Sequence, residues 1–115
     1  MALEIIGHLD IIELMENFIS KHQPPEHLRA KVDLSYKIEE QSVIIFEILP
    51  LWNKPNQTIE SHIAKATFIK KTECWKVFWL RSNLKWDSYT PTPTVSKLSD
   101  FLELVEEDKH SCFWG

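Results

Sequence analysis

Apolar residues near the N-terminus recur at intervals of three and four positions, with acidic residues between them. This period predicts an amphipathic helix over about residues 3–21, whose apolar stripe is formed by Ile5, Leu9, Ile12, Met15 and Ile19. The helix is expected to end before Pro24 and Pro25, because proline lacks a backbone N–H and disfavours helical geometry in the residue that precedes it.

From residue 31 the period changes to two. Val32, Leu34, Tyr36 and Ile38 alternate with polar residues, which predicts a half-buried strand. A turn at Glu40 and Gln41 leads into a second strand over residues 42–49 that is apolar on both faces and therefore central. Residues 50–61 contain two prolines and two asparagines, so a long loop is expected there.

Three further strands are predicted over residues 62–71, 74–82 and 84–90, joined by two-residue turns at Thr72-Glu73 and Ser82-Asn83. A polar loop then reaches Ser96, the expected N-cap of a second helix with an apolar face made of Leu98, Phe101, Leu102 and Val105. The order of helix, antiparallel sheet of about five strands and helix predicts an α+β fold. The length of 115 residues fits one domain over residues 1–115.

The predicted turns also assign the two faces of the sheet. They place Trp79 opposite Trp86 on a core face, whose predicted members are Ala64, Ala66, Phe68, Trp75, Val77, Trp79, Leu84 and Trp86. The opposite face would carry Lys65, Thr67, Ile69, Lys71, Lys76, Phe78, Leu80, Lys85, Asp87 and Tyr89. This second face is either open to solvent or covered by a helix, the long loop or another copy of the chain.

Charge adds a candidate function for that second face. The chain carries a net charge of −4, yet the stretch from His62 to Trp86 holds six lysines and arginines against the single acid Glu73. We therefore expect a non-catalytic binding or interaction module, with a site formed by Lys65, Lys76, Phe78, Lys85 and Tyr89. A protein partner or self-association is favoured over single-stranded nucleic acid, because the rest of the chain is acidic and repels a polyanion.

An enzyme is the alternative hypothesis. Asp33 and Glu47 on adjacent predicted strands, with Glu13 or Glu16 on the first helix, resemble the acidic residues by which some nucleases and hydrolases hold a divalent ion. Leu49 stands where that arrangement calls for a lysine. The alternation of Asp108, His110 and Cys112 matches no established zinc spacing. No phosphate loop, HExxH helix or nucleophile elbow is present, so no cofactor, metal ligand or catalytic residue is assigned.

The two cysteines, Cys74 and Cys112, lack metal or redox spacing, and nothing at the N-terminus resembles a cleaved leader. No apolar stretch approaches the about 20 residues of a membrane-spanning helix. These features predict a cytoplasmic protein that is not inserted in a membrane.

Several short motifs identify a family resemblance that covers nearly the whole chain. They lie at residues 24–29 (PPEHLR), 42–48 (SVIIFEI), 64–67 (AKAT), 75–79 (WKVFW), 84–86 (LKW) and 112–115 (CFWG). Together they resemble the short bacterial proteins grouped as domain of unknown function family 3024. The resemblance implies no activity, ligand or catalytic residue. The chain departs from the family pattern at Leu49, where an arginine is expected between Glu47 and Pro50.

Overall fold

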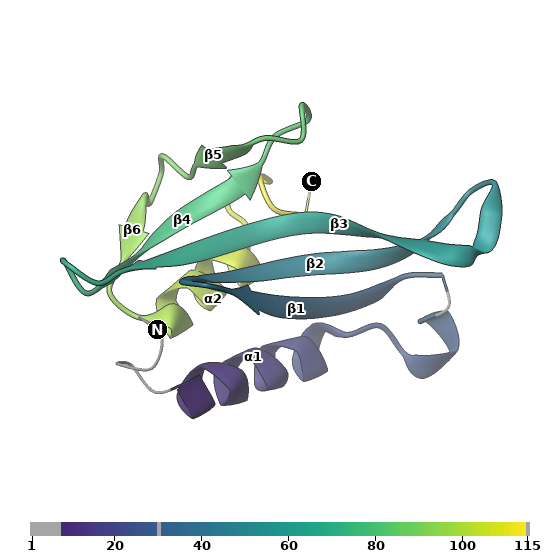
Figure 1. Cartoon of the computed structure of the whole chain (residues 1–115), viewed down its shortest axis with the longest axis horizontal. Helices are drawn as coiled ribbons and strands as arrows, with labels where there is room; N and C mark the ends of the chain where they lie inside the picture. The colour runs from purple at the N-terminus through teal and green to yellow at the C-terminus, as the bar shows by residue number, and fades with distance from the viewer. Residues whose placement is uncertain (1–7, 30, 115) are drawn as a thin grey trace.

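The computed structural model describes residues 8–29 and 31–114, and its elements follow one another in the order that Figure 1 shows. They are α1 (His8–His22), the short 3-10 helix η2 (Glu26–Leu28), β1 (Asp33–Glu39), β2 (Ser42–Leu51), β3 (Lys54–Ile69), β4 (Cys74–Leu80), β5 (Trp86–Ser88), β6 (Thr94–Val95) and α2 (Leu98–Glu107). Neither of the described α-helices has the length and apolar character needed to cross a lipid bilayer.

All strand pairs of the sheet are antiparallel, in the order β1-β2-β3-β4-β5, and the two-residue strand β6 also pairs with β4. Both α-helices lie against the same side of this sheet (Figure 1). The predicted α+β fold, with a helix before and a helix after an antiparallel sheet, is confirmed. Strand β6 lies in the segment predicted to be a polar loop.

The hydrophobic core fills the space between the helices and the sheet. Helix α2 contributes the four residues predicted for it, Leu98, Phe101, Leu102 and Val105. Helix α1 buries a stripe that is rotated from the predicted one and consists of Ile11, Met15, Phe18 and Ile19. Leu9, predicted to be apolar core, is exposed, and Ile5 lies outside the described residues. The predicted N-cap Ser96 precedes the observed one, Lys97, which makes no side-chain cap hydrogen bond.

The pairing of β3 with β4 confirms the predicted core face despite a different turn. Ala64 lies opposite Trp79 and Ile69 opposite Cys74, so residues 70–73 form a four-residue loop. This register differs from the predicted one by two residues. Because side chains alternate with a period of two, an even shift leaves each residue on its predicted face. Ala64, Ala66 and Phe68 therefore share the core face with Trp75, Val77 and Trp79.

The pairing of β4 with β5 contradicts the predicted faces. Leu80, not Trp79, lies opposite Trp86, because residues 81–85 form a five-residue loop. In this loop Leu84 adopts a left-handed φ of 64° and is 78% exposed, so it is not a core residue. A shift of one residue moves every side chain of β5 to the other side of the sheet. Trp86 consequently points away from the helices, and Asp87 and Tyr89 lie on the helix side.

The sequence predicts a loop over residues 50–61, but this prediction is wrong. The segment forms most of a long β-hairpin arm. Strands β2 and β3 continue past the ends of their neighbours, and only Trp52 and Asn53 connect them (Figure 1). Pro50 lies beyond the last pair of β1 with β2, which joins Asp33 to Ile48. Proline is tolerated at such a position, where one side of the strand has no neighbour.

Candidate functional site on the open sheet face

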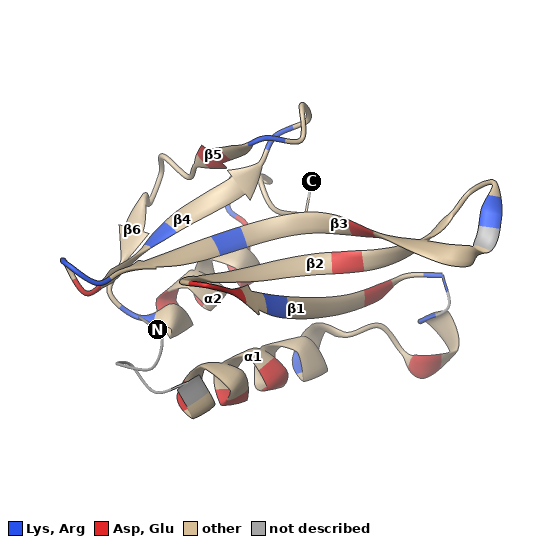
Figure 2. Cartoon of the chain, in the orientation of Figure 1, with Lys and Arg blue, Asp and Glu red and all other residues tan. Residues whose placement is uncertain are grey.

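Within residues 8–29 and 31–114, one side of the sheet carries no helix, and we call it the open face. Its side chains come from five strands: Lys37 and Glu39 on β1, Ile44 and Phe46 on β2, Glu60, His62 and Lys65 on β3, Lys76, Phe78 and Leu80 on β4, and Trp86 on β5. Figure 2 shows both basic and acidic residues on these strands, and Lys37, Glu39, Glu60 and Lys65 lie on the open face. The open face is therefore mixed in charge rather than uniformly basic.

Lys65 occupies the centre of the open face between two aromatic rings. Its Nζ atom lies 4.8 Å from the ring centroid of Phe78 and 4.9 Å from that of Trp86. The quadrupole of each ring attracts a cation in this position. Burial of the ammonium group lowers the pKa of Lys65 from its ordinary value. The lysine thus links β3 to β4 and β5 on the side of the sheet that lacks a helix.

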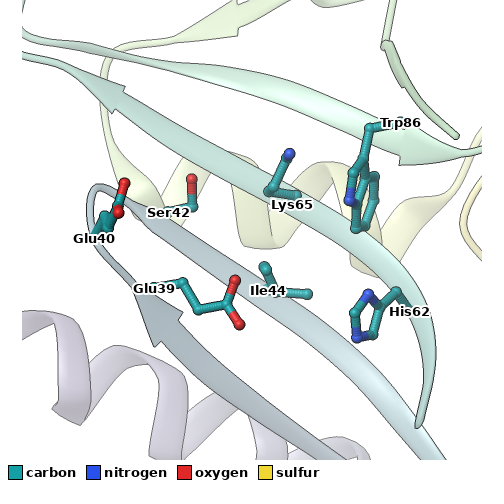
Figure 3. A pocket seen from close by; sticks show the side chains of 7 residues that line it. All are labelled: Glu39, Glu40, Ser42, Ile44, His62, Lys65 and Trp86. Atoms are coloured by element: carbon teal, nitrogen blue, oxygen red, sulfur yellow. The ribbon is translucent and has the colours of Figure 1, made fainter.

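His62 reaches this face because of a β-bulge. Ile45 pairs with Ala64 but the next residue, Phe46, pairs with His62, so β3 has one extra residue, Ile63. The bulge reverses the alternation of side chains, which brings His62 to the same face as Lys65. The imidazole of His62 stacks on the indole of Trp86, with centroids 6.0 Å apart and planes 15° apart. Figure 3 shows the two rings side by side.

A hollow of about 580 Å³ opens beside these rings (Figure 3). It extends from the β1–β2 turn to β5, and its lining residues are Glu39, Glu40, Ser42, Ile44, His62, Lys65 and Trp86. Two carboxylates and one ammonium group are among the groups that line the hollow. This combination suits a partner that presents both apolar and charged groups.

The floor of the open face is a second, smaller apolar cluster. Ile44 and Phe46 are buried, although neither belongs to the core beneath the helices. The Nζ atom of Lys37 lies 5.5 Å from the centroid of the Phe46 ring and 2.8 Å from Oε1 of Glu60. The same Glu60 oxygen is 3.1 Å from Nε2 of His62. The hydrogen bond from Lys37 lowers the pKa of the Glu60 carboxyl.

The structure brings together three of the five residues predicted for the site. Lys65, Lys76 and Phe78 share the open face, whereas Lys85 is exposed in the loop after β4. The prediction for Tyr89 is wrong. Tyr89 is 2% exposed in the core, its ring centroid lies 4.9 Å from that of Phe113, and burial raises the pKa of its hydroxyl.

The carboxylate pair of the enzyme hypothesis does not assemble. Asp33 pairs with Ile48 and Glu47 pairs with Leu34, so the two carboxylates point to opposite sides of the sheet. One oxygen of Asp33 also accepts hydrogen bonds from the Gln23 side-chain amide and from the Leu34 N–H, both at 2.8 Å.

The C-terminal Asp108 has a structural role. Its two carboxylate oxygens accept the N–H groups of Phe113 at 3.1 Å and Trp114 at 2.9 Å. Asp108 also ends α2 in a left-handed conformation, with φ 43°. Throughout residues 8–29 and 31–114, no group of three or more His, Cys, Asp or Glu side chains is arranged to hold a metal ion.

Comparison with known proteins places the chain in a family. The family model described as Domain of unknown function (DUF3024) matches residues 6–115, nearly the whole chain. The chain belongs to this family. No curated protein and no solved structure matches it. In this DUF3024 protein, Leu49 lines an apolar trough beside β3, in the place where the family resemblance leads us to expect an arginine.

The sequence of this DUF3024 protein gave no signal for several open-face residues. Trp86 and His62 reach the face through a five-residue loop and a bulge, and neither feature contains glycine, the residue that commonly marks such irregularities. The prolines and asparagines near Glu60 predict a loop there. The ion pair with Lys37 forms only because the arm extends β3 alongside β2.

Proposed function

We propose that this DUF3024 protein is a non-catalytic binding module that contacts a protein partner through its open face, in the bacterial cytoplasm. The observation that carries the proposal is that both helices lie on one side of the sheet, which leaves Phe78, Leu80 and Trp86 half-buried on the other. Apolar side chains grouped beside charged ones on an uncovered surface are typical of protein interaction sites.

The chemistry of the face suggests the kind of partner. Lys76 is exposed next to Phe78, and within the described ranges no carboxylate lies within ion-pair distance of it. A partner surface that combines apolar side chains with carboxylates would pair with Lys76 and cover the rings. Cys74 and Cys112 are both free, which supports a reducing, cytoplasmic compartment.

Single-stranded nucleic acid fits the same face less well. Bases bind by stacking on exposed aromatic rings, but the ammonium group of Lys65 already lies over both Phe78 and Trp86. The carboxylates of Glu39 and Glu60 would also repel a phosphate backbone. A protein partner does not need to stack on the rings, and it can place its carboxylates beside Lys76 and away from Glu39 and Glu60.

The proposal is tested by photo-cross-linking in cells. The photoreactive amino acid p-benzoylphenylalanine replaces Lys76, which is exposed on the open face. In the matched control it replaces Glu13, which is exposed on α1. We expect one discrete cross-linked species from position 76 and none from position 13, with the species lost when Phe78→Ser is added. Mass spectrometry then identifies the adduct as protein or nucleic acid.

Two outcomes would contradict the proposal. Equal labelling from positions 76 and 13 would mean that the open face has no preferred partner. A nucleic-acid adduct at position 76, together with salt-sensitive binding of oligonucleotides by the purified protein, would replace the protein partner with a polyanion.

A further inference from the structure

The ammonium group of Lys65 is half-buried, yet it makes no hydrogen bond and no ion pair with any residue that the structure describes. The rings of Phe78 and Trp86 attract the cation, but they present no oxygen atom to accept its hydrogens. Burial without such an acceptor disfavours the charged form and lowers the pKa of Lys65. A carboxylate brought to this ammonium group from outside would supply the missing acceptor.

The hollow beside Lys65 has an acidic end. Figure 3 shows Glu39 and Glu40 at the end that the β1–β2 turn forms, His62 and Trp86 at the other end, and Lys65 between them. Glu40 is exposed, and it makes no ion pair in the described part of the chain. The hollow therefore contains an ammonium group and a carboxylate that are both free to bind a ligand.

The strand register keeps these opposite charges apart. Glu39 lies opposite Ser42 and Lys65 lies opposite Ile44, so two strand spacings and a step of two residues separate Lys65 from Glu39. These spacings place the two Cα atoms about 12 Å apart. The volume of the hollow, about 580 Å³, lies within the range of about 300–1,000 Å³ that is typical of small-molecule sites.

The mixed charge of the hollow restricts the ligands that it can bind. A ligand with only negative charge would pair with Lys65 but would be repelled by the two carboxylates of the turn, and a ligand with only positive charge would meet the reverse situation. A molecule that carries one group of each sign meets neither repulsion. Glu40 is the available carboxylate for its positive group, because Glu39 already lies 3.4 Å from the Nζ atom of Lys37.

We propose that the hollow binds a small aminocarboxylate, whose carboxylate pairs with Lys65 and whose ammonium group pairs with Glu40. The carbon atoms between the two charges would lie over Ile44, beside the indole of Trp86.

The inference does not depend on the proposed function. The protein partner is tested at Lys76 and Phe78 on β4, and neither residue lines the hollow. The aminocarboxylate site is tested on the purified chain alone. Either proposal can therefore fail without the other.

The test is a titration of the ¹⁵N-labelled full chain with 4-aminobutyrate at low ionic strength, followed by nuclear magnetic resonance. We expect the indole N–H signal of Trp86, assigned with the variant Trp86→Phe, to shift and saturate. The other indoles are internal references, because none of them lines the hollow; they belong to Trp52, Trp75, Trp79 and Trp114.

Matched ligands separate the two charges. Butyrate lacks the ammonium group and butylamine lacks the carboxylate, and both retain most of the carbon chain. Each should bind at least about tenfold more weakly than 4-aminobutyrate, because one charged group of the site then stays unpaired and repels the ligand.

Matched variants separate the two protein groups. Lys65→Met should weaken the binding of 4-aminobutyrate by more than about tenfold, because the cation that holds the carboxylate is lost. Lys76→Met removes the same charge from an exposed position outside the hollow and should bind as the parent does. Glu40→Gln lies in an exposed turn, so it should keep the fold while weakening binding by about threefold or more.

Three results would overturn the inference. The first is no shift of the Trp86 signal up to about 100 mM ligand, where even a site with a dissociation constant of about 10 mM is mostly occupied. The second is equal affinity for butyrate, or unchanged affinity in both Lys65→Met and Glu40→Gln. The third is binding of a capped peptide that carries one aspartate and one lysine without binding of 4-aminobutyrate, which would assign the hollow to a protein segment.

Discussion

The indole of Trp86 stacks on the imidazole of His62, with ring centroids 6.0 Å apart and planes 15° apart. The stack spans the open face from β5 to β3, past the end of β4. Strand β5 has three residues, and β4 is its one partner strand in the described part of the chain. The contacts of Trp86 with His62 and Lys65 therefore add to the backbone pairing that holds β5 against the sheet.

Replacing Trp86 should destabilise the fold moderately. Trp86→Leu removes an aromatic pair, worth about 0.5–1.5 kcal/mol, and a cation–π contact of about 0.5–1 kcal/mol at a partly exposed site. We expect the free energy of unfolding to fall by about 1–2 kcal/mol in urea denaturation. Trp52→Leu is the control, because its indole is 93% exposed. If both variants unfold alike, the stack contributes nothing.

The two tryptophans of β4 that point toward the helices should differ in their contribution. Trp75 is fully buried, with its ring 5.3 Å from that of Phe68, whereas Trp79 is half-buried and lies beneath the guanidinium of Arg81. Trp75→Ala should lower the free energy of unfolding by about 3–5 kcal/mol. Trp79→Ala should lower it by about 1–3 kcal/mol, because less of its surface leaves water on folding. Equal losses in chemical denaturation would contradict the packing described for β4.

The ion pairs of Glu60 should make stability depend on pH in the acid range. The pKa of Glu60 is lower in the folded chain than its ordinary value of 4.5, mainly through the hydrogen bond from Lys37. The unfolded chain therefore takes up the proton more readily. This contribution is present above pH 4.5 and is lost as the pH falls through the folded-state value.

Urea denaturation at several pH values measures this dependence. The parent should lose stability more steeply than Glu60→Gln as the pH falls below 4.5. The difference should shrink at high salt, because the pair is exposed and screened. Glu103→Gln on α2 is the control, because Glu103 makes no ion pair in the described part of the chain. If the two variants show the same acid profile, the pairs with Lys37 and His62 do not stabilise the fold.

Periodicity alone predicted both helices, most of the strands and much of the core. The spacing of three and four predicted both helices, and the alternation of two predicted the strands, because each pattern reports which side chains one element can bury together. The core face of β3 and β4 was predicted correctly with a turn that is two residues too short. An even error in register leaves every side chain on its own side of the sheet.

Loop length and distant pairing were decided only by the tertiary structure. A five-residue loop in place of a two-residue turn shifts β5 by one position, which moves Trp86 to the open face and Tyr89 into the core. The bulge at Ile63 does the same for His62. Lys54 and residues 58–61 pair with β2 in a strand, although the composition of this segment favours a loop. Local sequence determines which side chains an element can bury together. The side of the sheet that each residue faces depends on the register to within one residue, and only pairing with another strand selects that register.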